Sequence, residues 1–180
     1  MFVSQKLRKE NVAEFLLYMW QVEDVLRAYT LDVDRLAEGY LSQFQYDASQ
    51  KQQVQQWYED LAEMMRSEGV AESGHLQINK NIVILLNDLH AELLRSTKHP
   101  FYSAAYYKAL PFIVELRQRS NTQDKTEIEN CFDAMYGLML LRLQGKPVSE
   151  ETTKAMNHIS QFLALLAEYE RKERAGELEF

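Results

Sequence analysis

A single carboxylate, Glu23, interrupts the apolar line of the first predicted helix. With about 100° of rotation per residue, Val12, Leu16, Met19 and Leu26 fall on the same helical line as Glu23. A charge on a buried line is costly unless it is paired or hydrogen-bonded. Glu23 therefore marks either a structural ion pair or a functional site.

Two arginines occupy comparable positions on other predicted helices. The apolar line 128–139 continues into Arg142, and the line 106–113 continues into Arg117. Because the planar guanidinium matches a carboxylate, we expect Glu23 to pair with Arg142, with Arg117 or with both inside the bundle. The alternative is that both arginines, near the carboxyl ends of their helices, reach water along their stems.

A polar cluster lies at residues 74–81, where His75 starts a predicted helix and Asn79 lies at the edge of its apolar stripe. Asparagine is unfavourable inside a helix, so Asn79 is expected to have a hydrogen-bonding role. His75 could cap the helix or contact an anion, and the alternative is a capping histidine beside an amide satisfied by nearby backbone. The candidate ligand-binding residues are Glu23, Asn79, His90, Tyr106, Arg117 and Arg142.

Recognised catalytic and metal-binding patterns are weak in this sequence. The Glu-x-x-His pair formed by Glu72 and His75 straddles Gly74 in a predicted loop, and no His-x-x-x-His spacing occurs. The sequence contains no glycine-rich phosphate loop and no serine elbow. The single cysteine, Cys131, excludes an internal disulfide and is expected to be a buried, inert thiol. We therefore expect no metal and no cofactor, and no catalytic residue is assigned.

The elements that position these residues are all predicted to be helices. The sequence has only 6 glycines and 3 prolines, which favours helix, and no run of alternating apolar and polar residues predicts a strand. Pro111 is expected to kink or restart its helix, Ser49 to cap the third helix, and Asn121–Lys125 to form a turn. The predicted helices span about 4 or 10 to 29, 33–44, 50–67, 75–96, 101–120, 126–144 and 150–174.

These patterns predict an all-α fold, a single helical bundle of about seven antiparallel helices. No linker divides the chain, so residues 1–180 are expected to form one domain with a charged, frayed tail at about 170–180. The net charge of −7 argues against nucleic acid and against anionic membrane surfaces as partners. Without a signal peptide or an apolar run of about 20 residues, the expected location is the cytoplasm.

Four segments carry a resemblance to a known family: LYMWQVED (17–24), GHLQINKN (74–81), LPFIVELR (110–117) and YGLMLLRL (136–143). The chain resembles, from Phe2 to about Tyr169, an uncharacterised domain-of-unknown-function family of small all-helical proteins from Bacteroidetes. The resemblance implies an all-helical fold and a bacterial cytosolic protein. It implies no activity, cofactor or catalytic residue.

Two functions remain open from the sequence. The segment 135–141 is apolar on more sides than a few neighbouring helices can cover. This pattern favours a non-catalytic bundle that associates as a homo-oligomer or adaptor. The alternative is a protein that binds an anionic small molecule, or an enzyme, with a buried polar site around Glu23, Arg117 and Arg142. Whether the protein is an enzyme is left open, although the sequence favours a non-catalytic role.

Overall fold

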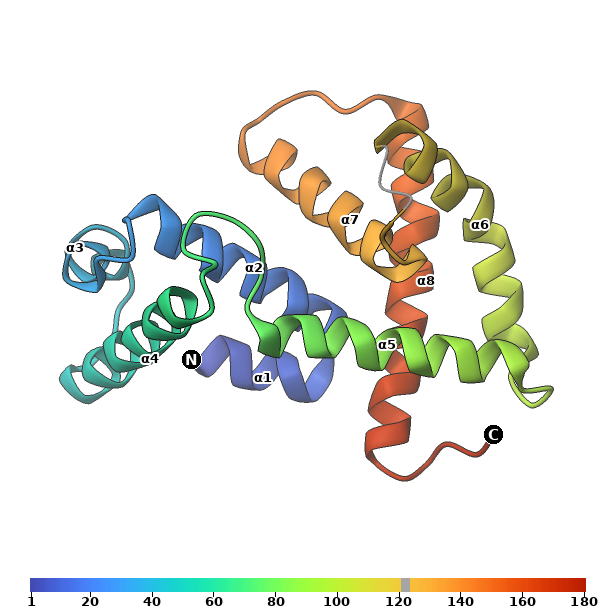
Figure 1. Cartoon of the computed structure of the whole chain (residues 1–180), viewed down its shortest axis with the longest axis horizontal. Helices are drawn as coiled ribbons and strands as arrows, with labels where there is room; N and C mark the ends of the chain where they lie inside the picture. Colours follow the sequence, from blue (N-terminus) through green and yellow to red (C-terminus); the bar gives the residue numbers. More distant parts are fainter. Residues whose placement is uncertain (121–123) are drawn as a thin grey trace.

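Helices make up the whole regular structure of the described chain. A computed structural model describes residues 1–120 and 124–180 (Figure 1). Within these residues there are eight α-helices, one short 3-10 helix and no strand, which confirms the predicted all-α bundle. The helices are α1 (Phe2–Glu10), α2 (Val12–Ala28), α3 (Val33–Gly39), η1 (Leu41–Gln43), α4 (Ala48–Ser67), α5 (Gln77–Arg95), α6 (Pro100–Ser120), α7 (Glu127–Leu143) and α8 (Glu150–Arg174).

The first predicted helix is two helices, because Asn11 ends α1 and caps α2. Its backbone is extended, with φ of −153°, and its side chain accepts hydrogen bonds from the backbone N–H groups of Ala13 and Glu14. The start of α4 also differs from the prediction. Asp47, and not Ser49, is its N-cap, in a reciprocal capping box with Gln50.

The predictions for the later helices have mixed outcomes. Pro111 lies inside the continuous helix α6, so the helix does not restart there. Figure 1 shows that the axis of α6 bends along its length. Residues 121–123 of the turn predicted at Asn121–Lys125 lie outside the described residues. The last helix, α8, ends at Arg174 as predicted, and near this end the carboxylate of Glu170 accepts hydrogen bonds from Arg8 (2.8 Å) and Arg174 (3.2 Å).

The helix α2 contributes to both apolar clusters of the molecule, as expected for a helix with little polar surface. Its Leu16 and Trp20 pack with residues of α5 to α8, whereas Met19 and Leu26 pack with residues of α3 and α4. Figure 1 shows α3 and α4 at one end and α6 to α8 at the other, with α2 and α5 reaching from the first group to the second. Glu23, the buried carboxylate of α2, therefore lies where the two apolar clusters meet.

Candidate functional site

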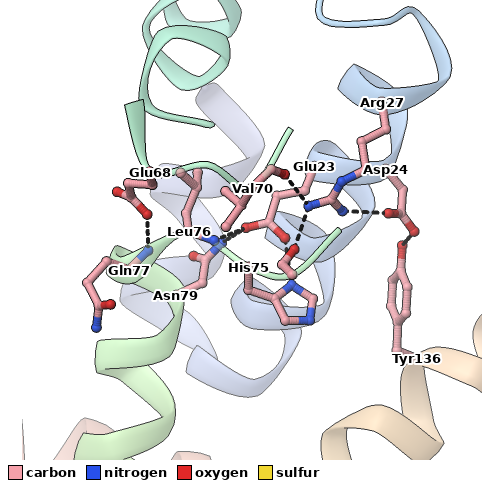
Figure 2. A network of polar contacts seen from close by, with 11 residues as sticks. Glu23, Asp24, Arg27, Glu68, Val70, His75, Leu76, Gln77, Asn79 and Tyr136 are labelled. Atoms are coloured by element: carbon pink, nitrogen blue, oxygen red, sulfur yellow. Dashed lines mark hydrogen bonds and ion pairs between the residues drawn. The ribbon is translucent and has the colours of Figure 1, made fainter. Parts of the chain in front are cut away.

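Glu23 is buried at the amino end of α5, where it accepts three hydrogen bonds. Its side chain is on α2 and the residue is 0% exposed. Oε1 accepts from the backbone N–H of Leu76 (2.9 Å) and from Nδ2 of Asn79 (2.7 Å). Oε2 lies 2.6 Å from Nδ1 of His75 (Figure 2). Because a carboxylate carries only acceptors, we take Nδ1–H as the donor in this third bond.

The predicted pairing of Glu23 with Arg142 or Arg117 is therefore wrong. The physical reason lies at the start of α5, whose first N–H groups have no helical partners and carry a partial positive charge. Leu76, the N-cap residue of α5, has no side chain that could accept these donors. Glu23 takes this role from another helix, and the hydrogen-bonding role predicted for Asn79 is confirmed with Glu23 as its partner.

The loop before α5 is fixed to α2 by Arg27. One guanidinium nitrogen donates to the carbonyl oxygens of Val70 (3.0 Å) and Gly74 (Figure 2). The other terminal nitrogen lies 2.9 Å from Oδ1 of Asp24, whose Oδ2 accepts from the hydroxyl of Tyr136 on α7 at 2.6 Å. These contacts fix the position of His75, which follows the loop, relative to α2 and α7.

A pocket of about 310 Å³ opens beside this network, between α2, α5 and the start of α7. The imidazole of His75 forms part of its wall and stacks on the indole of Trp20, with ring centroids 4.1 Å apart and an angle of 14° between the rings. Most lining residues are polar or charged, and Trp20, Val83 and Ile84 supply the apolar side chains of the wall. The lining residues are Trp20, His75, Gln77, Asn79, Lys80, Val83, Ile84, Asn87, Lys125, Thr126, Glu129 and Asp133.

Two buried polar atoms of the pocket residues have no hydrogen-bond partner: the donor Nε1 of Trp20 and the acceptor Oδ1 of Asn79. Trp20 is 3% exposed and Asn79 is 0% exposed, so water does not satisfy these atoms from the surface. Leaving such a group unpaired costs about 1–3 kcal/mol. Native structures contain few of these groups, and here both belong to residues that line the pocket.

The charges at the mouth of the pocket are mostly engaged. Lys125 lies 2.7 Å from the carboxylate of Asp133, and this bond raises the pKa of the lysine. Glu129 accepts from the backbone N–H of Thr126 in the capping box of α7. Lys80 is exposed and no ion pair joins it to another described residue. The pocket therefore has one unpaired cation at its solvent edge.

Three other candidate residues lie around Glu127, in a second polar group that does not line the pocket. The hydroxyl of Tyr106 donates to Oε2 of Glu127 at 2.7 Å, and Nη1 of Arg117 lies 3.8 Å from Oε1. The ring of His90 contacts that of Tyr106, and its Nδ1 lies 2.6 Å from the hydroxyl of Tyr102. Burial lowers the pKa of His90. The six predicted residues thus do not share one site.

Arg142 lies in neither group. It is exposed near the carboxyl end of α7, as expected if its stem leads its charge to water. Trp20 and His75 are pocket residues that the candidate set did not include. Two signals could have indicated them: Trp20 precedes Glu23 by three positions, on the same side of the helix, and His75 precedes Asn79 by four.

Among the described residues, neither the cysteine nor any acidic or histidine cluster gives a second candidate centre. Cys131 is buried, and burial raises the pKa of its thiol, which makes it unreactive. Over residues 1–120 and 124–180, no three His, Cys, Asp or Glu side chains gather closely enough to hold a metal ion. None of the helices in these ranges has the length and apolar character needed to cross a membrane.

Comparison with known proteins identifies a family for almost the whole chain. A family model described as "Domain of unknown function (DUF4924)" matches residues 1–177. No curated protein and no solved structure matches the chain. Since the match covers far more than half of its length, the chain belongs to the DUF4924 family of domains of unknown function.

Proposed function

We propose that this chain is a small-molecule-binding protein whose ligand occupies the pocket between α2, α5 and the start of α7. The observation that carries the proposal is this pocket of about 310 Å³, whose wall includes two side chains, His75 and Asn79, that Glu23 holds in place.

The network around Glu23 prepares this wall for binding. Glu23 holds His75 and Asn79, so the positions of both side chains are set before a ligand arrives.

A fragment screen followed by NMR tests the proposal. Fragments that bind should shift the backbone and side-chain signals of Trp20, His75 and Asn79 together. The substitution Ile84→Phe narrows the pocket, because Ile84 lines it, and should weaken binding at least fivefold. Val114→Phe is the matched control, since Val114 is a β-branched residue that is 43% exposed on α6 and is not part of the lining. Binding that is unchanged by Ile84→Phe, or no binding at all, contradicts the proposal.

A second proposal is self-association as a homodimer, because α5 exposes large apolar side chains. Ile78 and Leu85 lie two turns apart on one side of the helix and are 41% and 58% exposed. Light scattering on chromatographic fractions should show a dimer that Leu85→Glu converts to a monomer. A monomer at every concentration contradicts this proposal.

The resemblance to small helical proteins of Bacteroidetes further supports the proposal that this is a cytoplasmic protein of a Bacteroidetes bacterium.

A further inference from the structure

The pocket that the proposed function invokes has one wall residue, His75, whose hydrogen-bonding polarity is set by a neighbouring residue. We infer that the ligand donates an N–H or O–H hydrogen bond to Nε2 of His75, which Glu23 holds as an acceptor. The ligand therefore belongs to the neutral hydrogen-bond donors, such as azoles, amides and phenols, and not to the carboxylates. This inference rests on the proposed function, because it names the chemical class of the molecule in the same pocket.

The carboxylate of Glu23 determines which ring nitrogen of His75 carries the proton. It accepts hydrogen bonds from the backbone N–H of Leu76 and from Nδ2 of Asn79. An ionised carboxylate has no proton to give, and its Oε2 lies 2.6 Å from Nδ1 of His75, so Nδ1 is the donor in that bond. A neutral imidazole has a single N–H, and Nε2 therefore keeps a lone pair that can accept.

Nε2 is also the part of the His75 ring that a ligand can reach. The Nδ1 edge faces Glu23, whose side chain is 1% exposed, and one face of the ring stacks on the indole of Trp20. The side chain of His75 is nonetheless 32% exposed, and it belongs to the pocket wall. Among the described residues Nε2 has no hydrogen-bond partner, and it is not a buried atom. Figure 2 shows it on the side of the ring away from the carboxylate.

The orientation of this ring is set before a ligand arrives. Turning the imidazole over would direct the carbon Cδ2 at the carboxylate of Glu23 in place of Nδ1, and a buried charged group would lose a donor. Arg27 fixes the backbone before the ring, because it donates to the carbonyl oxygen of Gly74. A ligand that can only accept would place its lone pair against that of Nε2, and such a mismatch in a protein site is strongly disfavoured.

Three flat fragments of nearly the same size separate the possible polarities. Indole donates through its N–H, quinoline accepts through its ring nitrogen, and indene does neither. Binding is followed by NMR titration of the full chain, with the ¹⁵N signals of the His75 ring reporting which nitrogen carries the proton. Nδ1 should carry it in the free protein. Indole should bind at least fivefold more tightly than quinoline and indene, and should shift the Nε2 signal.

Glu23→Gln should reverse this preference. The NH₂ group of the glutamine would face Nδ1 of His75, so Nδ1 must accept and the proton must move to Nε2. The ratio of indole affinity to quinoline affinity should then fall at least tenfold. Glu68→Gln is the matched control, because it removes an exposed carboxylate from the same end of α5 and should leave the ratio unchanged.

The outcomes separate the ligand class from the pocket itself. The ligand class is wrong, while the pocket stands, if quinoline binds as tightly as indole or if other fragments bind and indole does not. It is equally wrong if Nε2 carries a proton in the free or the bound protein, or if Glu23→Gln leaves the ratio unchanged. If neither these compounds nor any screened fragment affects Trp20, His75 and Asn79, the proposed function is wrong. The wild-type measurements decide the question even if Glu23→Gln fails to fold.

Discussion

Glu23→Gln is the substitution that most directly tests the network at the start of α5. Glutamine has nearly the same shape and can keep one oxygen near the N–H of Leu76 and Nδ2 of Asn79. Its NH₂ group, however, then faces Nδ1 of His75, so the imidazole must carry its proton on the other ring nitrogen to keep a hydrogen bond. The substitution also removes a negative charge from the positive end of α5.

These losses set the expected magnitude. A hydrogen bond to a charged group contributes about 1.5–3 kcal/mol, against about 0.5–1.5 kcal/mol for a neutral one. The favourable contribution of a charge at a helix end is about 0.3–1 kcal/mol and increases when the group is buried. Because a neutral amide is cheaper to bury than a carboxylate, part of the loss is offset. We expect Glu23→Gln to lower the free energy of unfolding by about 1–3 kcal/mol.

Urea unfolding followed by circular dichroism measures this difference. Glu68→Gln is the matched control, because Oε2 of Glu68 accepts from the N–H of Gln77 (2.6 Å) at the same helix end while the side chain is exposed (Figure 2). The control should lose less than about 1 kcal/mol, the range for an exposed charge at a helix end. If Glu23→Gln loses no more than Glu68→Gln, burial and the three donors do not stabilise the fold as argued.

Three further predictions concern other parts of the fold. Burial lowers the pKa of His90 below its ordinary value of 6.5, so this histidine binds a proton more readily in the unfolded chain than in the folded one, and its contribution to stability is present above pH 6.5 and is lost as the pH falls. The free energy of unfolding of His90→Gln, measured in urea from pH 7 to 5, should therefore depend less on pH than that of the wild type. An unchanged pH profile contradicts the lowered pKa of His90. Gly39→Ala should lower the free energy of unfolding by about 1–3 kcal/mol, and with it the midpoint of thermal unfolding, because the added Cβ would lie 2.6 Å from the hydroxyl of Tyr29. Gly137→Ala should raise the free energy of unfolding by about 0.5–1 kcal/mol, and with it the same midpoint, because Gly137 lies inside α7 and nothing lies within 4 Å of the added Cβ.

The burial of Glu23 could be predicted from the sequence, whereas its partners could not. Helical periodicity reports which side of a helix is covered, and Glu23 is indeed 0% exposed. Its donors come from residues 75, 76 and 79, and one of them is a backbone N–H, which no residue type reveals. The prediction of an arginine partner considered side-chain charges alone and left out the charge of the helix end.

The candidate residues could also not be sorted into groups from their sequence. Asn79 and His90 lie on one helix, yet eleven positions separate them, about 16 Å along the axis at 1.5 Å per residue. Asn79 therefore contacts α2, and His90 contacts the rings of α6 and α8. Local periodicity places both near the apolar side of α5 and carries no information about which neighbouring helix covers each end.

The structural role of Glu23 and the polarity of the pocket follow from the same hydrogen bonds. Because Nδ2 of Asn79 donates to the carboxylate, the amide oxygen must lie on the other branch of that side chain, directed away from Glu23. Reversing the amide would place its oxygen against a carboxylate oxygen, which is electrostatically unfavourable. Glu23 therefore determines which atom of Asn79 remains available. The same carboxylate engages Nδ1 of His75 and leaves Nε2 on the far side of the ring. A substitution at Glu23 should thus change which fragments bind as well as stability, and the fragment screen repeated on Glu23→Gln under conditions where the variant is folded separates the two effects.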